Sequence, residues 1–229
     1  MPAIMILLVF TLSTLAPAAD AYVAYSYAGE CKIPIYEQGV RATFNTVNPT
    51  YVTDSAVAYF IGVFFPDGSW VQVGYLRGWY QVNPHAGYYQ ATVPTVYVEQ
   101  SLESGSIVTT FQTLSIGSYH TYTIMRTGVD AYGFWMWSAY VDGVLRCSVQ
   151  SIYEDAVEIV AEGESHNTLD SSASKVYFSS LQQYQIDYPR RGAIIYAWHP
   201  WDGYSGSLCD SWAGWNIVTG SNSFQIWMT

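Results

Sequence analysis

The feature that most constrains the fold of this sequence is a long series of short segments in which apolar and polar residues alternate. The segments are rich in Val, Ile, Thr, Tyr and Trp, and turn residues separate them about every dozen positions. We expect strands at 41–47, 57–64, 70–76, 92–100, 107–113, 119–126, 133–141, 144–150, 157–164, 175–185, 193–198 and 223–228. No stretch has a sustained helical period. The pattern predicts an all-β chain of two antiparallel sheets packed as a jelly-roll sandwich.

Two of the turns have a clear physical basis. In Pro66-Asp67-Gly68, the proline presets φ and the glycine accepts a positive φ. Asp142-Gly143 stands between two strand patterns and predicts a type I′ hairpin. By contrast, the segment 199–220 is rich in Gly, Ser and Trp, and we expect it to be a long loop before the last strand.

The charge balance limits the partners of the chain. Its 229 residues carry a net charge of −10, and only 11% of them are charged. Nucleic acid is therefore not expected as a partner, because phosphate binding needs a cationic surface. Few charges also mean few ion pairs that acid can break, which is compatible with work at low pH.

The N-terminal segment 1–21 reads as a signal peptide. Its apolar region is 4–10, and 16–18 or 19–21 offers a small-residue cleavage site, although no Lys or Arg precedes the apolar region. An uncleaved anchor or a buried strand is the alternative. No later stretch is apolar for long enough to span a membrane. We expect a secreted, extracellular protein whose residues 22–229 form a single domain.

The cysteines fit an oxidising compartment and do not suggest a metal site. Cys31, Cys147 and Cys209 allow one disulfide and one free thiol, and all three pairings stay open. No Cys-x-x-Cys or Cys/His cluster predicts structural zinc. Four aspartates in expected turns could ligate calcium, but they lack a spaced ligand motif: Asp130, Asp142, Asp202 and Asp210. We therefore expect no metal and no cofactor.

Several polar side chains share strand faces. Since side chains alternate along a strand, Glu158, Glu162 and Glu164 lie on one face of the strand 157–164. Three carboxylates on one face are costly inside a core, so they face water, a ligand or one another. One interpretation is an ordinary solvated sheet face. The other is a cleft for a glycan or a peptide, lined by Trp70, Gln72, Tyr97, Glu99, Glu158 and Glu162.

Two motifs on these strands resemble the glutamic peptidase (eqolisin) family. Phe60-Ile61-Gly62, followed by Val71-Gln72-Val73-Gly74, is similar to the family's Trp-Val-Gly strand and Gln-x-Gly core. The segment 157–162 keeps both glutamates of the family's Ala-Glu-Trp-Ile-Val-Glu at the same spacing, with Ile159 in place of the Trp.

The resemblance extends to two further strands. Residues 97–99 look like the family's glutamate-bearing aromatic strand, and 176–178 resemble its closing core strand. The similar region covers roughly residues 41–185, and the family's tail does not match 199–229.

The resemblance implies a concanavalin-like sandwich and acid-acting endopeptidase chemistry. It makes Glu162 the general base and then the acid, and Gln72 the group that orients a water and stabilises the oxyanion. Substrate-binding residues would be Trp70, Tyr97, Glu99 and Glu158, and the partner a peptide or protein substrate. Two other functions remain open: a non-catalytic glycan-binding, lectin-like module, and a secreted structural or surface protein.

Overall fold

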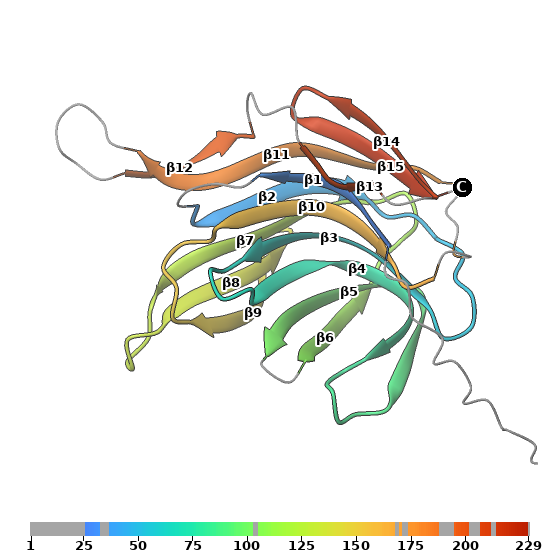
Figure 1. Ribbon diagram of the computed structural model, residues 1–229, viewed down its shortest axis with the longest axis horizontal. Helices are drawn as coiled ribbons and strands as arrows, with labels where there is room; N and C mark the ends of the chain where they lie inside the picture. The colour runs from blue at the N-terminus through green and yellow to red at the C-terminus, as the bar shows by residue number, and fades with distance from the viewer. Residues whose placement is uncertain are drawn as a thin grey trace, which may run out of the picture.

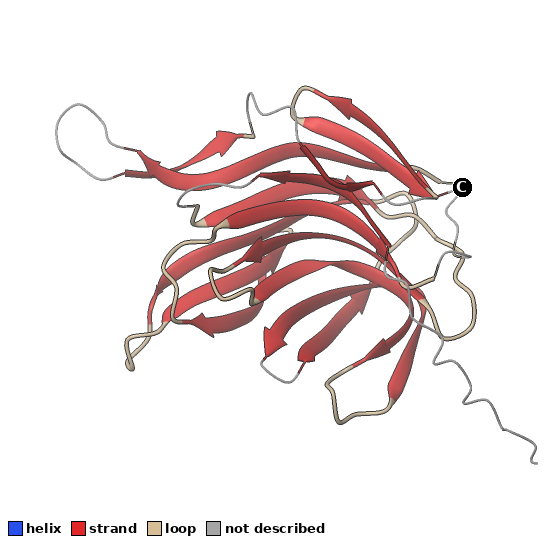
Figure 2. Ribbon diagram, in the orientation of Figure 1, coloured by secondary structure: helices blue, strands red, loops and turns tan. Residues whose placement is uncertain are grey.

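A computed structural model describes residues 26–32, 37–102, 105–167, 170, 174–187, 195–201, 207–211 and 214–228. The expected signal peptide, 1–21, lies outside the described residues. The described chain consists of strands joined by turns and loops (Figure 2). None of these residues forms a helix that is long and apolar enough to cross a membrane.

The strands form two sheets, and every strand pairing is antiparallel (Figure 1). The seven-stranded sheet has, in spatial order, β13 (Ser207–Ser211), β1 (Ser26–Lys32), β10 (Glu158–Ser165), β3 (Ala56–Phe64), β4 (Trp70–Gln81), β5 (Tyr88–Leu102) and β6 (Gly105–Thr113). The eight-stranded sheet has β14 (Trp215–Gly220), β15 (Ser223–Met228), β11 (Val176–Asp187), β2 (Gly39–Asn45), β7 (Tyr119–Val129), β8 (Trp135–Val141) and β9 (Val144–Ser151), and β12 (Ile195–Pro200) pairs with β11. The predicted all-β sandwich is confirmed.

The main core lies between the two sheets. Along β3, Val57, Tyr59 and Ile61 point into this core, so the residues that alternate with them face outward. Aromatic rings fill the centre of the core: Phe44 stacks on Tyr122 with ring centroids 4.1 Å apart. A second, smaller cluster of buried side chains belongs to the seven-stranded sheet alone. We call the side of this sheet that carries the second cluster its outer face.

All twelve strands expected from alternation are present, but three more were missed. The prediction of a loop over 199–220 is wrong, because this segment contains β13 and β14. Both are short strands at sheet edges that carry Gly, Ser or Cys, so they lack an apolar-polar alternation. β1 was missed because Glu30, rather than an apolar residue, pairs with the core residue Ala161.

The two predicted turns are confirmed. Gly68 has φ +81°, and its N–H donates to the Phe65 carbonyl. Asp142 and Gly143 have φ +53° and +76°, the left-handed pair that a type I′ hairpin requires.

The structure excludes two of the three possible disulfide pairings. Cys31 on β1 is disulfide-bonded, and Cys147 on β9 carries a free thiol. The two pairings that involve Cys147 are therefore absent. The side chain of Cys209 lies outside the described part of the chain.

Candidate active site

The structure places Gln72 and Glu162 on the outer face of the seven-stranded sheet. Gln72 on β4 pairs with Gly62 on β3, and Gly62 pairs with Val160 on β10. Glu162 lies two residues further along β10, so it is in the next row of side chains that share this face. The two candidate catalytic groups are therefore diagonal neighbours, with β3 between them.

Glu158 lies one row from Gln72 in the opposite direction along β10. It pairs with Phe64, which in turn pairs with Trp70. Both Glu158 and Glu162 thus stand one row from Gln72. They differ in exposure, since Glu162 is 6% exposed and Glu158 is only half-buried. The more buried carboxylate, Glu162, is the one that the family resemblance assigns as the base.

Gly62 on β3 lies between Gln72 and Val160, while Phe60 is the residue of β3 in the row of Glu162. Gly62 is the residue of β3 that lies in the row of Gln72, and it has no side chain to stand between β4 and β10. A Cβ at this position would meet a methyl of Val160 at 3.0 Å and the Cβ of Gln72 at 3.6 Å. Gly62 therefore adds no side chain beside Gln72 in this row, and the nearest side chain there is that of Val160.

We expect Gly62→Ala to fold and to lose activity. Its extra methyl group would contact the Val160 side chain, which can shift, and would lie 3.6 Å from the Cβ of Gln72. A displacement of about 1 Å at a reacting centre costs about 10²-fold in rate. Peptidase kcat should therefore fall by about 10- to 100-fold, while the thermal midpoint of unfolding changes little. Full activity in this variant would show that the reacting groups do not lie beside Gly62.

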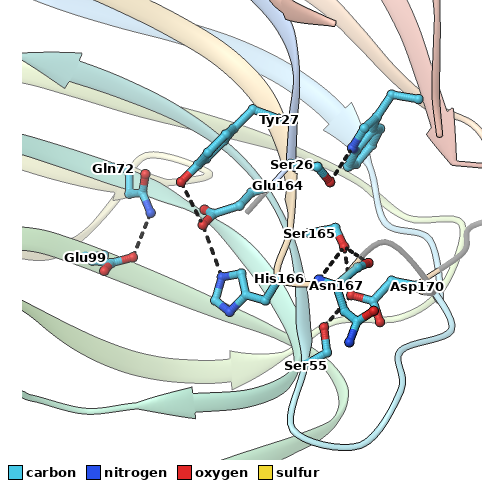
Figure 3. A network of polar contacts seen from close by, with 11 residues as sticks. Ser26, Tyr27, Ser55, Gln72, Glu99, Glu164, Ser165, His166, Asn167 and Asp170 are labelled. Atoms are coloured by element: carbon cyan, nitrogen blue, oxygen red, sulfur yellow. Dashed lines mark hydrogen bonds and ion pairs between the residues drawn. The ribbon is translucent and has the colours of Figure 1, made fainter. Parts of the chain in front are cut away.

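Gln72 is held by Glu99. The Gln72 Nε2 donates a hydrogen bond of 2.7 Å to the Glu99 Oε2, and the two side chains point toward each other across β4 and β5 (Figure 3). Burial and the charge of Glu164 raise the pKa of the Glu99 carboxyl above its ordinary value. Hydrogen bonds from Ser106 and Gln72 partly oppose this rise. The amide of Gln72 is thus fixed by a partner on the neighbouring strand.

A second polar group lies on the same face. Glu164 Oε1 accepts hydrogen bonds from the Tyr27 hydroxyl at 3.3 Å and from His166 Nε2 at 3.1 Å (Figure 3). Burial alone would lower the pKa of the His166 imidazole, but the hydrogen bond and charge of Glu164 raise it above its ordinary value. His166 and Glu164 therefore form an ion pair beside Glu99.

His166 was missed in the sequence, although its spacing from Glu164 could have indicated it. It follows Glu164 by two residues, so the alternation of β10 continues through it. Its N–H donates to the Ala56 carbonyl. Asp170, which follows β10, is buried and accepts hydrogen bonds from the hydroxyls of Ser55 and Ser165.

The remaining predicted site residues also lie on the outer face. Trp70 is half-buried, with its ring centroid 6.3 Å from that of Phe64. Tyr97 pairs with Gly74 and is 1% exposed. The sheet thus brings together all six residues that the sequence singled out, and their roles remain predictions.

A Ser–His–Asp arrangement lies on the eight-stranded sheet. His120 Nε2 is 2.8 Å from Ser118 Oγ, and His120 Nδ1 is 2.6 Å from Asp142 Oδ2. The Ser118 hydroxyl also lies 2.5 Å from the Ser115 carbonyl, and Asp142 Oδ1 accepts from the Thr121 N–H. These contacts join the turn before β7 to the β8–β9 hairpin, so we interpret the arrangement as structural.

Within the described residues, no group of three or more His, Cys, Asp and Glu is arranged to hold a metal ion. Asp130 accepts from the N–H groups of Tyr132 and Phe134, and Asp142 from that of Thr121. These two aspartates are thus engaged locally in their turns. Asp202 and the side chain of Asp210 lie outside the described residues.

Two solved structures of glutamic peptidases have a fold similar to that of this chain. Scytalido-glutamic peptidase, solved with a peptide-based transition-state analogue, aligns over 89% of this chain and 98% of its own, with a TM-score of 0.53 and 11% identity. The fold is that of the glutamic peptidases. SCP-B, a member of the eqolisin family solved with the tripeptide Ala-Ile-His, aligns over the same shares with a TM-score of 0.51 and 10% identity.

No protein-family model matches the sequence, and no curated protein matches it either. At 10–11% identity, the likeness to the glutamic peptidases establishes the sandwich fold that the resemblance implied. The chemistry must be argued from this chain's own residues.

Proposed function

We propose that the protein is a secreted, acid-acting endopeptidase that hydrolyses peptide bonds with Gln72, Glu162 and one activated water. The observation that carries this proposal is that Gln72 and Glu162 lie on the same face of one sheet, one row apart, with β3 between them. The fold likeness supports it, because the neighbouring scytalido-glutamic peptidase structure holds a peptide-based transition-state analogue.

In the first step, Glu162 acts as the base. Its carboxylate takes a proton from the water while the water oxygen attacks the carbonyl carbon of the substrate. Carboxyl groups titrate in the acid range, so a glutamate can both accept this proton and later return it at low pH. The negative charge that develops on the carbonyl oxygen then needs a hydrogen-bond donor.

Gln72 is placed to be this donor. A primary amide carries two N–H donors and does not titrate, so it still stabilises an oxyanion at low pH. One donor of Nε2 is engaged by Glu99, and this bond fixes the direction of the other. When the C–N bond breaks, Glu162 returns the proton to the leaving amine, so no metal is required.

The proposal is tested with the wild-type protein and casein between pH 2 and 5, with pepstatin present to silence aspartic peptidases. We expect cleavage that reaches its maximum in this range and persists with pepstatin. If no casein fragments or cleaved peptide-library members appear at any pH, the proposed function is wrong.

A further inference from the structure

A cavity of about 190 Å³ opens on the outer face beside Glu99, the hydrogen-bond partner of Gln72. It begins at Glu99, in the same row of side chains as Gln72, and reaches Ala58 and Leu76 two rows away. Two rows correspond to about 13 Å along a strand, since each residue rises about 3.3 Å. The cavity is smaller than the roughly 300–1,000 Å³ sites of drug-sized ligands. It therefore suits a single substrate side chain next to the reacting bond.

The cavity is acidic. Three carboxylates line it, those of Asp54, Glu99 and Glu164, against the single imidazole of His166. His166 is already paired with Glu164 (Figure 3). One imidazole thus faces two interacting carboxyl groups, since the charge of Glu164 raises the pKa of Glu99, and a cation that enters the cavity would be attracted to both.

The buried hydroxyl of Tyr97 is a second, independent sign of a ligand. Tyr97 lines the cavity and is 1% exposed, and its hydroxyl oxygen has no hydrogen-bond partner among the described residues. A buried polar group without a partner costs about 1–3 kcal/mol. A ligand that brings N–H groups into the cavity would supply the missing hydrogen bond.

The other walls are aromatic. Trp79, Tyr80 and Tyr88 also line the cavity. Aromatic faces attract organic cations, and an ammonium or guanidinium group on an alkyl chain would use both kinds of wall. An apolar side chain would instead bury the carboxylates without compensation.

We infer that this cavity is a specificity pocket that takes a lysine or arginine side chain of the peptide substrate. The inference rests on the proposed function, because it names the side chain preferred by the same cleft. Glu164 pairs with the cationic head, the Glu99 carboxyl and the Tyr97 hydroxyl accept its N–H groups, and the aromatic residues cover its alkyl chain.

The test compares peptides that differ at one position, with lysine against its neutral analogue norleucine, and arginine against citrulline. At one position next to the cleaved bond we expect kcat/KM to be at least 10-fold higher for the cationic member. Glu164→Gln should lower this ratio by at least fivefold, and Tyr97→Phe should lower it by a smaller factor. Glu154→Gln is the matched control, because Glu154 pairs with Arg126 on the other sheet, and it should keep the ratio.

Equal kcat/KM for both members at every position, or a ratio that neither cavity variant changes, overturns the inference. A binding measurement separates this outcome from a failure of the proposed function. n-Butylguanidinium should bind the wild-type protein at least 10-fold more tightly than the neutral n-butylurea, and Glu164→Gln should remove the difference. If no peptide is cleaved, the proposed function fails, and equal binding of the two probes would then overturn the cation pocket as well.

Discussion

Replacing Gln72 by Ala should lower kcat for peptide hydrolysis by about 10²–10³-fold, because it removes the donor to the oxyanion. Replacing Glu162 by Gln should lower kcat by about 10²–10⁴-fold, because the amide cannot accept the proton of the attacking water. In both variants KM should change much less than kcat, since these contacts strengthen in the transition state. The measurement is steady-state cleavage of a fluorogenic peptide at pH 4.

The matched control for this prediction is Glu158→Gln. Glu158 stands one row from Gln72, as Glu162 does, but it is more exposed and faces Phe64 at the other end of the site. We expect this variant to retain activity within about 10-fold of wild type, as for a group that contacts substrate without transferring its proton. If Glu158→Gln abolishes cleavage and Glu162→Gln does not, the base is Glu158 and our assignment is wrong. Unchanged activity in both Gln72→Ala and Glu162→Gln would exclude the dyad.

The face on which these residues lie could be predicted from the sequence, because alternation in a strand fixes which side chains share a side. Glu158 and Glu162 lie on the outer face, as expected, while Ile159 and Ala161 enter the core. What alternation cannot supply is the register between strands that are distant in sequence. The position of Gly62 between Gln72 and Val160 depends on the register of β10, β3 and β4, and no local pattern contains that register.

The unknown register between strands also explains why the hydrogen bonds between the polar groups could not be predicted. The hydrogen bond between Gln72 and Glu99 joins residues on neighbouring strands, and that between Tyr27 and Glu164 joins residues 137 positions apart in the sequence. Tyr27 lies on β1, where Glu30 faces the core side and disrupts the apolar pattern. β1, which contributes Tyr27 to the site, could therefore not be predicted from alternation.

The second prediction with a large expected effect concerns the free energy of unfolding, which should be greatest in mild acid and fall toward neutral pH. Burial raises the pKa of the Glu30 carboxyl to about 7. Burial also raises the pKa of Glu37 to about 7, with nearby Lys32 lowering it and Asp155 raising it in part. In the unfolded chain both glutamates would titrate near their ordinary value of about 4.3.

The direction of this pH dependence follows from whether the folded or the unfolded chain holds the protons of Glu30 and Glu37. Below about pH 4 both glutamates are protonated in the folded and the unfolded chain, so they do not affect stability. Between about pH 4.3 and 7 the unfolded chain releases these protons and the folded chain keeps them, so the free energy of unfolding falls as pH rises. Above pH 7 the buried carboxylates are ionised and the loss is complete. The raised pKa of His166 acts in the same direction, because its protonated form is favoured in the folded chain.

We expect the free energy of unfolding to be about 2–4 kcal/mol lower at pH 8 than at pH 4.5. Each unit of pKa shift corresponds to about 1.4 kcal/mol, and partial access of solvent to Glu30 and Glu37 reduces the effect. Urea unfolding at intervals from pH 4 to 8 measures it. In Glu30→Gln and Glu37→Gln, which cannot ionise at these positions, the slope should become flatter, and in the double variant it should fall to the remainder set by His166 and Glu99. Asp67→Asn, a substitution in an exposed turn, should keep the wild-type slope over this range. A free energy of unfolding that rises toward pH 8, or a double variant with the wild-type slope, would show that the two buried glutamates do not set the pH dependence.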